Sequence, residues 1–316
     1  MINKKEPSVV FMGTPDFAVP TLMAIHNAGF HIPFVVTQPD RPKGRGRTLA
    51  PPPVKETAVK LGYRVFQPEN IRETEINHRI QEISPDFLVV IAFGQILPLE
   101  LLQLPNHGAI NVHASLLPKY RGPAPIQWAL LRGEKKTGAT TILMDSGVDT
   151  GDMLLRQETD IRAEENADQL HQRLARLGAD LLIKTLKQIW EGTVFPQAQK
   201  HNEATYAPML KKKDGRINWN QPAEDLDHFV RAMTSWPGAY SFCGDKRLKI
   251  IEARPCDQLS QNVSPGTVIE SFPDELRVAA SQGALLIEEI QSQSGRSMPT
   301  KDFLRGNAIA PGSILE

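Results

Sequence analysis

The alternation of strand-like and helix-like segments along roughly the first 115 residues constrains the fold of this chain most strongly. Helical periodicity at 54–61 and 73–83 separates short apolar runs that favour strands. These runs are residues 8–12, 32–37, 64–66, 87–92 and 109–113. A series of this kind folds into a mostly parallel sheet with helices on both faces. We therefore predict an α/β domain with a doubly wound, mostly parallel, Rossmann-like sheet.

A dinucleotide-binding role does not follow from this pattern. The first turn, Gly13–Ala18, lacks the three-glycine fingerprint of dinucleotide sites. No acidic residue occupies the ribose position after the second strand-like run. The dehydrogenase class is therefore rejected.

The length of the chain indicates more than one domain. Its 316 residues exceed the usual limit for a single hydrophobic core. A long amphipathic pattern from 166 to 190 stops at Gly192, and a polar stretch follows it. We therefore expect a first domain at 1–192, an extended linker at 193–208 and a second domain at 209–316.

The second domain has a different pattern from the first. One helical segment, 223–234, precedes short strand-like runs that are separated by turn residues. These runs are residues 248–253, 266–269, 276–279 and 285–290. Strands of this length and spacing predict a small β-barrel.

Two polar residues in the run 109–113, Asn111 and His113, are the most informative pair for function. Because side chains alternate along a strand, both leave the same face. An amide can donate to an oxyanion, and an imidazole can carry a proton near pH 7. The loop Ser115–Gly122 follows directly, and α/β proteins place active sites where strands give way to loops. The alternative is that Asn111 caps a turn and His113 is a hydrogen-bonded core residue.

A glycine-rich acidic loop, Asp145–Asp152, follows another strand-like run at 137–145. It lacks EF-hand spacing and a terminal bidentate Glu, so we assign no calcium site to it. Among its acids, Asp149 is the best candidate to orient or charge His113. A solvated turn is the alternative that the spacing alone favours.

Local excesses of basic residues leave nucleic acid open as a partner. Lys+Arg and Asp+Glu both number 36, so the net charge gives no indication of a polyanionic partner. The loop at 37–53 nevertheless holds four cations among prolines and glycines. We predict a mobile clamp for a phosphate-bearing substrate, fixed only in places, with a flexible surface excursion as the alternative. Lys211–Arg216 and Lys246–Lys249 form a second local excess.

Cysteine usage and hydropathy predict a cytoplasmic protein. Cys243 and Cys256 make neither a disulfide framework nor a metal site. The longest apolar stretch, 87–104, is interrupted by glycine, glutamine, proline and glutamate, so it predicts a strand and a short helix instead of a membrane span. The apolar run near the N-terminus is too short for the core of a signal peptide.

Motifs along the whole chain resemble those of the methionyl-tRNA formyltransferases. The Asn-x-His, Ser-Leu-Leu-Pro and Asp-Thr-Gly-Asp motifs are shared by the wider group of 10-formyltetrahydrofolate-dependent formyltransferases. The proline- and arginine-bearing loop and the C-terminal region narrow the resemblance to the tRNA enzymes. The matching segments are Phe11–Ala18, Thr37–Pro42, Gly44–Gly46, Ile110–His113, Ser115–Pro118, Arg121–Ile126, Met144–Asp145 and Asp149–Asp152.

The resemblance implies transfer of the formyl group of 10-formyltetrahydrofolate to the α-amino group of methionine on initiator tRNA. It implies that Asn111 is the oxyanion donor, His113 the acid–base group and Asp149 the third catalytic residue, with no metal required. It also implies that the second domain is an OB-like barrel that binds the tRNA. We expect the chain to act as a monomer, without a membrane partner.

Two sets of binding residues carry over from the same resemblance. The folate is expected to lie against Phe93, Gly94, Ile96, Leu97, Ser115, Leu116, Leu117, Pro118 and Asp145. The tRNA is expected to contact Arg45 in the basic loop, together with Lys43, Arg47, Lys211, Lys212 and Lys213.

Two competing functions belong to different classes. A related formyltransferase that acts on a nucleotide sugar is disfavoured by the basic loop and by Lys211–Lys213. A tRNA-binding module with a degenerate catalytic half is disfavoured because Asn111, His113 and Asp149 occur together. Formylation assays on methionyl-initiator tRNA, free methionine and an aminated sugar nucleotide would separate these functions.

Overall fold

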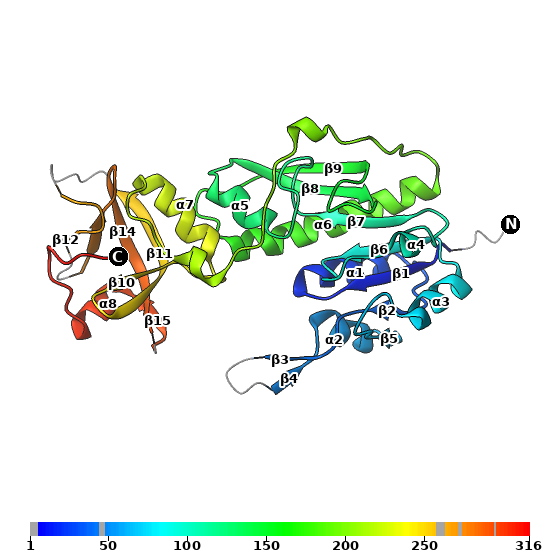
Figure 1. Ribbon diagram of the computed structural model, residues 1–316, viewed down its shortest axis with the longest axis horizontal. Helices are drawn as coiled ribbons and strands as arrows, with labels where there is room; N and C mark the ends of the chain where they lie inside the picture. Colours follow the sequence, from blue (N-terminus) through cyan, green and yellow to red (C-terminus); the bar gives the residue numbers. More distant parts are fainter. Residues whose placement is uncertain (1–5, 44–47, 257–262, 271–273, 294) are drawn as a thin grey trace. The chain divides into compact units, whose positions relative to one another are not determined.

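The computed structural model describes residues 6–43, 48–256, 263–270, 274–293 and 295–316, and for Lys43, Thr74 and Glu270 it describes the backbone alone. The chain divides into two compact units, whose elements follow the chain colours in Figure 1. Unit 1 comprises residues 1–122, 136–160 and 171–207, and unit 2 comprises residues 123–135, 161–170 and 208–316. The domain boundaries expected at 192 and 208 stay a prediction.

Unit 1 is built on a seven-stranded sheet with the order β5-β2-β1-β6-β7-β8-β9 (Figure 1). Neighbours among β5, β2, β1, β6 and β7 are parallel, whereas β8 pairs antiparallel with both β7 and β9. The predicted doubly wound, mostly parallel sheet is confirmed. The strands are β1 (Val9–Gly13), β2 (Val35–Val36), β5 (Val65–Phe66), β6 (Phe87–Ile91), β7 (Ala109–His113), β8 (Lys136–Leu143) and β9 (Met153–Asp160).

The edge strand β9 is the main element of this sheet that the sequence pattern did not predict. Its side chains alternate between exposed and partly buried along most of its length. Because an edge strand needs only one apolar face, its polar residues gave no hydrophobic run to detect. The central strands β1 and β6 are buried throughout and were predicted for that reason.

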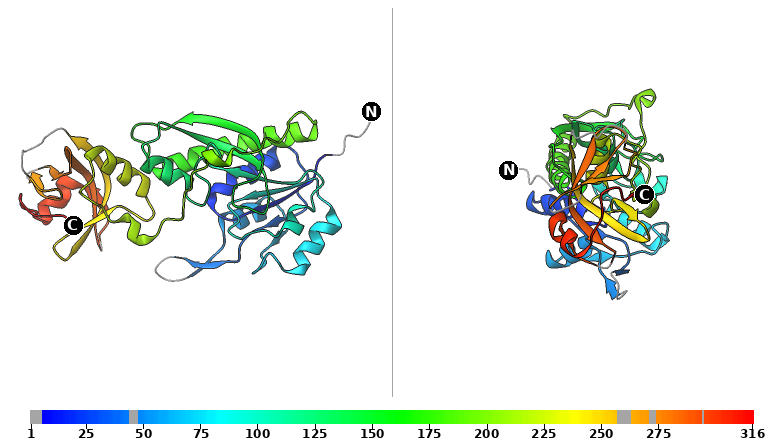
Figure 2. Two further views of the ribbon diagram at one scale, coloured as in Figure 1. Left: turned by 45° about the horizontal axis from the view of Figure 1, so that its top comes forward. Right: turned by 90° about the vertical axis from the view of Figure 1, so that its left-hand side faces the viewer.

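Helices cover both faces of the sheet in unit 1 (Figure 2). On one face, Leu88 and Val90 of β6 share a core cluster with Ile76 and Ile80 of α3 and Leu101 of α4. On the other face, α6 approaches β7 closely. The helices are α1 (Val19–Asn27), α2 (Pro53–Lys60), α3 (Thr74–Ile83), α4 (Leu99–Leu102) and α6 (Ala167–Trp190), and the 3₁₀ turn η1 (Asp16–Ala18) precedes α1.

The close approach of α6 to β7 depends on a glycine within the helix. A Cβ atom added at Gly178 would lie 2.6 Å from the Val112 side chain. Any larger residue would therefore require either α6 or the Val112 side chain to shift, on the strand that carries Asn111 and His113. With 24 residues α6 is a long helix, but it is amphipathic and not apolar on all sides. None of the helices in the described part of the chain is long and apolar enough to cross a membrane.

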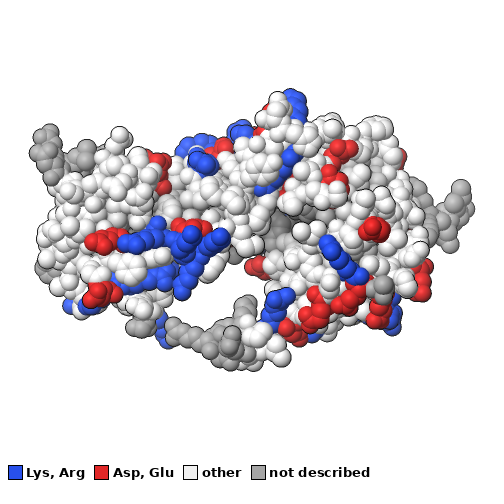
Figure 3. Space-filling model, in the orientation of Figure 1, with Lys and Arg blue, Asp and Glu red and all other residues white. Residues whose placement is uncertain are grey.

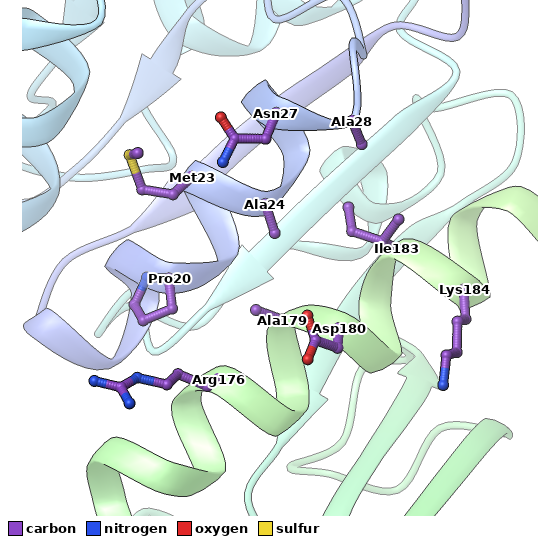
Figure 4. A pocket seen from close by; sticks show the side chains of 10 residues that line it. All are labelled: Pro20, Met23, Ala24, Asn27, Ala28, Arg176, Ala179, Asp180, Ile183 and Lys184. Atoms are coloured by element: carbon purple, nitrogen blue, oxygen red, sulfur yellow. The ribbon is translucent and has the colours of Figure 1, made fainter.

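A groove remains between α1 and α6 in unit 1 (Figure 4). Its floor is mostly apolar, and three charged residues of α6 stand one turn apart along it. The residues that the sequence nominated for catalysis or binding do not line this groove. The lining residues are Pro20, Met23, Ala24, Asn27, Ala28, Arg176, Ala179, Asp180, Ile183 and Lys184.

The basic loop after β2 contains a short antiparallel hairpin of β3 (Arg41–Lys43) and β4 (Thr48–Ala50). The Asp40 carboxylate anchors its base, because it accepts hydrogen bonds from Lys55 Nζ at 2.7 and 2.8 Å and from Gln67 Nε2 at 2.7 Å. Strand pairing and these bonds fix the two arms of the loop, which the sequence did not predict as strands. Residues 44–47, which include Arg45 and Arg47, lie outside the described residues.

Unit 2 is built on an antiparallel sheet with the order β10-β11-β14-β13-β12, in which β15 also pairs with β14. Near the C-terminus, Ile314 bridges Thr267 and Leu315 bridges Cys243, so main-chain bonds join the two ends of the sheet. The predicted small barrel is confirmed as an antiparallel half-barrel. Its strands are β10 (Tyr240–Cys243), β11 (Lys246–Cys256), β12 (Val268–Glu270), β13 (Leu276–Ala279), β14 (Ala284–Ser292) and β15 (Ser297–Pro299).

The helices of unit 2 are α5 (Pro125–Leu131), α7 (Ala223–Met233) and α8 (Thr300–Gly306). Leu226 and Val230 of α7 share a buried cluster with Leu285 and Ile290 of β14. The sequence predicted α7 from its amphipathic pattern but not α5. The seven residues of α5 are too few and too uniformly apolar to display a helical period.

Candidate active site

The three residues expected to act in catalysis lie together at the carboxyl end of β7 in unit 1. Asn111 is partly exposed, and His113, the last residue of β7, is 6% exposed. Asp149 comes from the loop between β8 and β9. Its Oδ1 atom lies 3.4 Å from Asn111 Nδ2, and its Oδ2 atom lies 3.5 Å from His113 Nδ1. Residues 38 positions apart in the sequence thus form one polar cluster.

Both nitrogens of the His113 ring face oxygen acceptors. Nε2 lies 2.8 Å from the main-chain oxygen of Tyr120. Because a carbonyl can only accept a hydrogen bond, this contact places a proton on Nε2. On the other side, Nδ1 faces the Asp149 carboxylate at a separation slightly longer than an ordinary hydrogen bond. A ring that takes up a second proton would therefore find an acceptor for each N–H group.

Asp149 adopts an unusual backbone conformation at this site. Its φ angle is +54°, in the left-handed region that few residues other than glycine enter. The backbone N–H of Gly122 donates to its Oδ2 at 2.8 Å, in addition to the contacts with Asn111 and His113. The carboxylate is therefore held on three sides by groups from β7 and from the loop that follows it.

The side chains of Gln199 and Arg121 complete the support of this loop, and the sequence did not nominate either of them. Gln199 Nε2 donates to the main-chain oxygens of Asp149 and Gly151 at 2.8 and 2.7 Å. Gln199 Oε1 accepts from Nε and Nη2 of Arg121 at 3.1 and 2.7 Å. The resemblance had placed Arg121 within a matching motif but had given it no role.

The segment that carries Gln199 was expected to be an extended linker. It runs in extended form past the 3₁₀ turn η2 (His201–Glu203), and its main chain is bonded to unit 1. Gln197 pairs with Met153, and the Arg121 backbone bonds to Thr205 and Ala207. A polar composition alone could not distinguish a solvated connector from a segment whose glutamine is buried. The general signal in the sequence was the residue type of Gln199, because an amide side chain can form hydrogen bonds with the backbone groups of a loop.

The loop after β7 is fixed by hydroxyl groups. Ser115 Oγ donates to the Lys119 main-chain oxygen at 2.6 Å. Thr140 Oγ1 donates to the Ser115 main-chain oxygen at 2.7 Å and accepts from the Leu117 N–H at 3.2 Å. Ser115 and Leu117 are buried, whereas Leu116 and Pro118 are partly buried. Of these four residues of the expected folate set, only the latter two present side-chain surface.

The remaining expected folate residues divide into buried and exposed groups. Phe93 and Leu97 belong to the buried core cluster of unit 1, so a ligand could reach them chiefly through the backbone. Gly94 is exposed with φ +90°, and Ile96 is 72% exposed. Asp145 is exposed, and its Oδ1 atom accepts from Gly147 N–H and Thr150 Oγ1.

Val148 was not singled out from the sequence, although it lies next to Asp149. Its side chain is 61% exposed, which is unusual for a large apolar residue beside a polar cluster. Together, Ile96 and Val148 give the carboxyl-end loops of unit 1 exposed apolar surface. The sequence signal for Val148 was an apolar residue inside an otherwise polar loop.

The residues expected to contact tRNA are distributed over both units. Lys43 belongs to the backbone of β3, while Arg45 and Arg47 lie outside the described residues. In unit 2, Lys211, Lys212 and Lys213 are all exposed; Lys211 precedes the 3₁₀ turn η3 (Lys212–Gly215), and the other two lie within it.

A basic and aromatic face lies on the β10–β11 hairpin of unit 2 (Figure 3). Tyr240 is paired with Lys249, and Phe242 with Arg247, so their side chains share one face of the hairpin. Arg247 stacks over the Tyr240 ring at 3.8 Å, and Arg216 lies over the Phe242 ring at 5.6 Å. Three basic residues, Arg216, Arg247 and Lys249, therefore lie on one face together with Tyr240 and Phe242.

The described residues form no candidate metal centre. Within the parts of the chain that the structure describes, no three His, Cys, Asp or Glu side chains are grouped so that they could hold an ion. Cys243 and Cys256 are free thiols.

Comparisons with known proteins identify the class to which this fold and site belong. The family model "Formyl transferase" matches residues 7–186, and the model "Formyl transferase, C-terminal domain" matches residues 209–308. The chain is therefore a formyl transferase in class. A methionyl-tRNA formyltransferase of Citrifermentans bemidjiense is 48% identical over 97% of this chain and 96% of its own length. Another, of Caldanaerobacter subterraneus subsp. tengcongensis, is 47% identical over 98% and 99%. The chain belongs to the methionyl-tRNA formyltransferase family.

Solved structures support the same fold at much lower sequence identity. The sugar 3N-formyl transferase WlaRD superposes with a TM-score of 0.68 at 18% identity, over 92% of this chain and 99% of its own. The N-formyltransferase from Helicobacter canadensis gives a TM-score of 0.68 at 19% identity, over 90% and 99%. At these identities the likeness concerns the fold and not the acceptor.

Proposed function

We propose that this chain transfers the formyl group of 10-formyltetrahydrofolate to the α-amino group of methionine on initiator methionyl-tRNA. One observation carries the proposal: Asn111 and His113 each lie within 3.5 Å of the Asp149 carboxylate at the carboxyl end of β7. This is the edge of an α/β sheet at which ligands bind. The chemistry needs an oxyanion donor and a proton acceptor side by side, and these residue types supply both.

The loops beside these residues suit a folate. When bound, 10-formyltetrahydrofolate would supply the formyl carbon, with N10 as the leaving nitrogen. Ile96 and Val148 expose apolar surface that a flat ring system could cover, and Gly94 offers an open backbone next to them. The proposed contacts are the exposed side chains of this region, the backbone at Phe93 and Leu97, and the Ser115–Pro118 and Asp145–Asp149 segments.

Asn111 has an N–H for the oxyanion. A side-chain amide carries two N–H bonds, and one of them is directed at Asp149 Oδ1. The other can donate to the formyl oxygen as negative charge builds on it. A fixed donor at that point stabilises the transition state more than the ground state.

His113 handles the proton. The α-amino nitrogen gains a bond to the formyl carbon, the bond from that carbon to N10 breaks, and the amine loses a proton, which His113 accepts at Nδ1, the ring nitrogen that carries none, and can return to the leaving nitrogen. Asp149 faces the ring from the Nδ1 side and stabilises the charge that the ring then carries. The buried position of the ring keeps that charge close to the carboxylate.

The acceptor is proposed to be tRNA because basic residues recur in one loop of the sequence and on one face of unit 2. Arg45 and Arg47 belong to the sequence between β3 and β4, and in unit 2 the exposed Lys211–Lys213 shortly precede Arg216, which shares a face with Arg247 and Lys249. Guanidinium groups stacked on Tyr240 and Phe242 are held in fixed positions, which suits contacts with phosphates and bases. We further propose that the protein acts as a monomer in the cytoplasm and that its reaction requires no metal ion.

An acceptor comparison tests this function. Initial rates with 10-formyltetrahydrofolate would be measured on methionyl-initiator tRNA, free methionine and an aminated nucleotide sugar, each with and without EDTA. The proposal expects transfer to the tRNA alone, at a rate that EDTA leaves unchanged. Activity on the sugar and not on the tRNA would overturn the assignment of the acceptor.

A further inference from the structure

A closed ring of hydrogen bonds, completed by the chain itself, passes through Asp149. The Asp149 carboxylate accepts from the Gly122 N–H, and Gly122 follows Arg121 in the chain. The Arg121 guanidinium donates to Gln199, and Gln199 donates back to the Asp149 main-chain oxygen. Arg121 is 2% exposed and Gln199 is 4% exposed, so water cannot replace these bonds.

The orientation of the Gln199 amide follows from the chemistry of its partners. Its nitrogen faces two carbonyl oxygens, those of Asp149 and Gly151, which can only accept. Its oxygen faces a guanidinium, which can only donate. No other orientation satisfies all four bonds, and glutamate in this place would set a carboxylate against two carbonyl oxygens.

Arg121 is itself fixed on more than one side. Its Nη1 and Nη2 atoms each lie 3.3 Å from His201 Nδ1. Its main-chain N–H donates to the Thr205 oxygen, and its main-chain oxygen accepts from the Ala207 N–H. Residues 199–207 therefore hold both the arginine and the neighbouring Gly122 that contacts the carboxylate.

We propose that Gln199 and Arg121 are positioning residues for catalysis. They hold Asp149 in its left-handed conformation, with φ +54°, so that its carboxylate faces His113 and Asn111. This inference rests on the proposed function only through the role of Asp149 in the reaction. The segment expected to join two domains thus supplies part of the active-site support.

The test compares Gln199→Glu with Gln197→Glu. The two changes introduce the same group two positions apart, but the Gln197 side chain is exposed and its bonds to Met153 are made by the main chain. Gln199→Glu should lower kcat about 10- to 100-fold, since a misplaced catalytic group costs rate far more than binding. KM for both substrates should change little, and Gln197→Glu should behave as the wild type.

A double-mutant cycle separates positioning from general structural support. In an Asp149→Asn background, Gln199→Glu should add less than about a twofold loss, because its effect has already been removed. The pH–rate profile of Gln199→Glu should also match that of Asp149→Asn. Losses that multiply in the double variant, with an unaltered profile, would overturn the inference.

Amide hydrogen exchange provides a readout that needs no substrate. The Gly122 N–H, which donates to Asp149, should lose protection in Gln199→Glu and keep it in Gln197→Glu. If Gln199→Glu does not fold, Arg121→Lys keeps the charge but loses the paired donors, and it should show the same pattern more weakly. Unchanged kcat and unchanged protection would contradict the inference, whichever acceptor the wild type uses.

Discussion

Asp149 shows how the local backbone serves the chemistry at the scale of single residues. A non-glycine residue in the left-handed region costs on the order of 1 kcal/mol or more, and such residues persist where their surroundings fix them. Here the fixing groups are Gly122, Asn111 and Gln199, each bonded to Asp149. The same conformation turns the carboxylate toward His113, so the strain accompanies the geometry that the proposed reaction requires.

The amide of Asn111 gives a first prediction. Asn111→Ala should lower kcat roughly 10²–10³-fold, the usual loss when an oxyanion donor is removed. Folate affinity should stay close to that of the wild type, because the proposed mechanism places the amide against the formyl oxygen and not against the ring system. Steady-state kinetics with a separate folate-binding titration would check both parts. A loss confined to folate affinity would recast Asn111 as a binding residue.

Gly122 gives a second prediction, for stability. Its φ is +114°, and an added Cβ would lie 2.9 Å from the Ala207 main-chain oxygen. Gly192, with φ +69°, has no atom within 4 Å of such a Cβ, so Gly192→Ala should cost only about 1 kcal/mol of unfolding free energy. Gly122→Ala should cost clearly more in urea unfolding. Equal costs would show that the segment around Ala207 moves aside freely.

At the scale of elements, the hairpin β3–β4 depends on one carboxylate at its base. A hydrogen bond from Gln67, followed by the hydrogen bond and charge of Lys55, lowers the pKa of Asp40 below its usual value. A depressed folded pKa adds stability that is present above the unfolded pKa of about 3.9 and is lost as pH falls through the folded value.

The third prediction follows from the lowered pKa of Asp40. The difference in unfolding free energy between the wild type and Asp40→Asn should be present at about pH 6 and should shrink as the pH falls below about 4. Urea unfolding at a series of pH values measures it directly. A difference that grew on acidification would contradict the pairing of Asp40 with Lys55 and Gln67.

The basic face of β10 and β11 gives a fourth prediction. Replacing Arg247 and Lys249 together by Gln should reduce the slope of log affinity for tRNA against log salt by about 0.7–0.9 for each phosphate that is no longer neutralised. Arg254→Gln is a matched control on the same strand, because Arg254 already pairs with Glu288 at 2.8 Å. Filter binding over a range of salt concentrations would distinguish the two. An identical slope in all variants would remove this face from the tRNA-binding surface.

Elements also show which parts of the structure the sequence could reveal. The buried strands β1, β6 and β7 and the amphipathic helices α6 and α7 carry long, clear hydrophobic patterns, and each was predicted close to its observed bounds. The edge strand β9 and the hairpin β3–β4 owe their form to pairing with an adjacent strand, and the short helix α5 owes its form to packing against the core of unit 2. Their own sequences show no period that could reveal this.

The same division holds for the site. Asn111 and His113 could be paired from strand alternation, and the resemblance nominated Asp149. Gln199 could not be found, because its role depends on a backbone turn 48 to 50 positions earlier in the chain. The sequence marks Val148 as an apolar residue in a polar loop, but only the structure shows that its side chain is exposed.

At the scale of the whole molecule, an α/β unit carries the proposed catalytic cluster, and a half-barrel unit carries a basic face. The proposed function requires that the chemistry occur at His113 when the acceptor is methionyl-initiator tRNA. The most direct test is the single-turnover rate of formyl transfer to that tRNA at saturating 10-formyltetrahydrofolate, in the wild type and in His113→Ala. We predict rapid transfer by the wild type and a rate about 10²–10⁴-fold lower for the variant. An undiminished rate in His113→Ala would contradict the proposed mechanism.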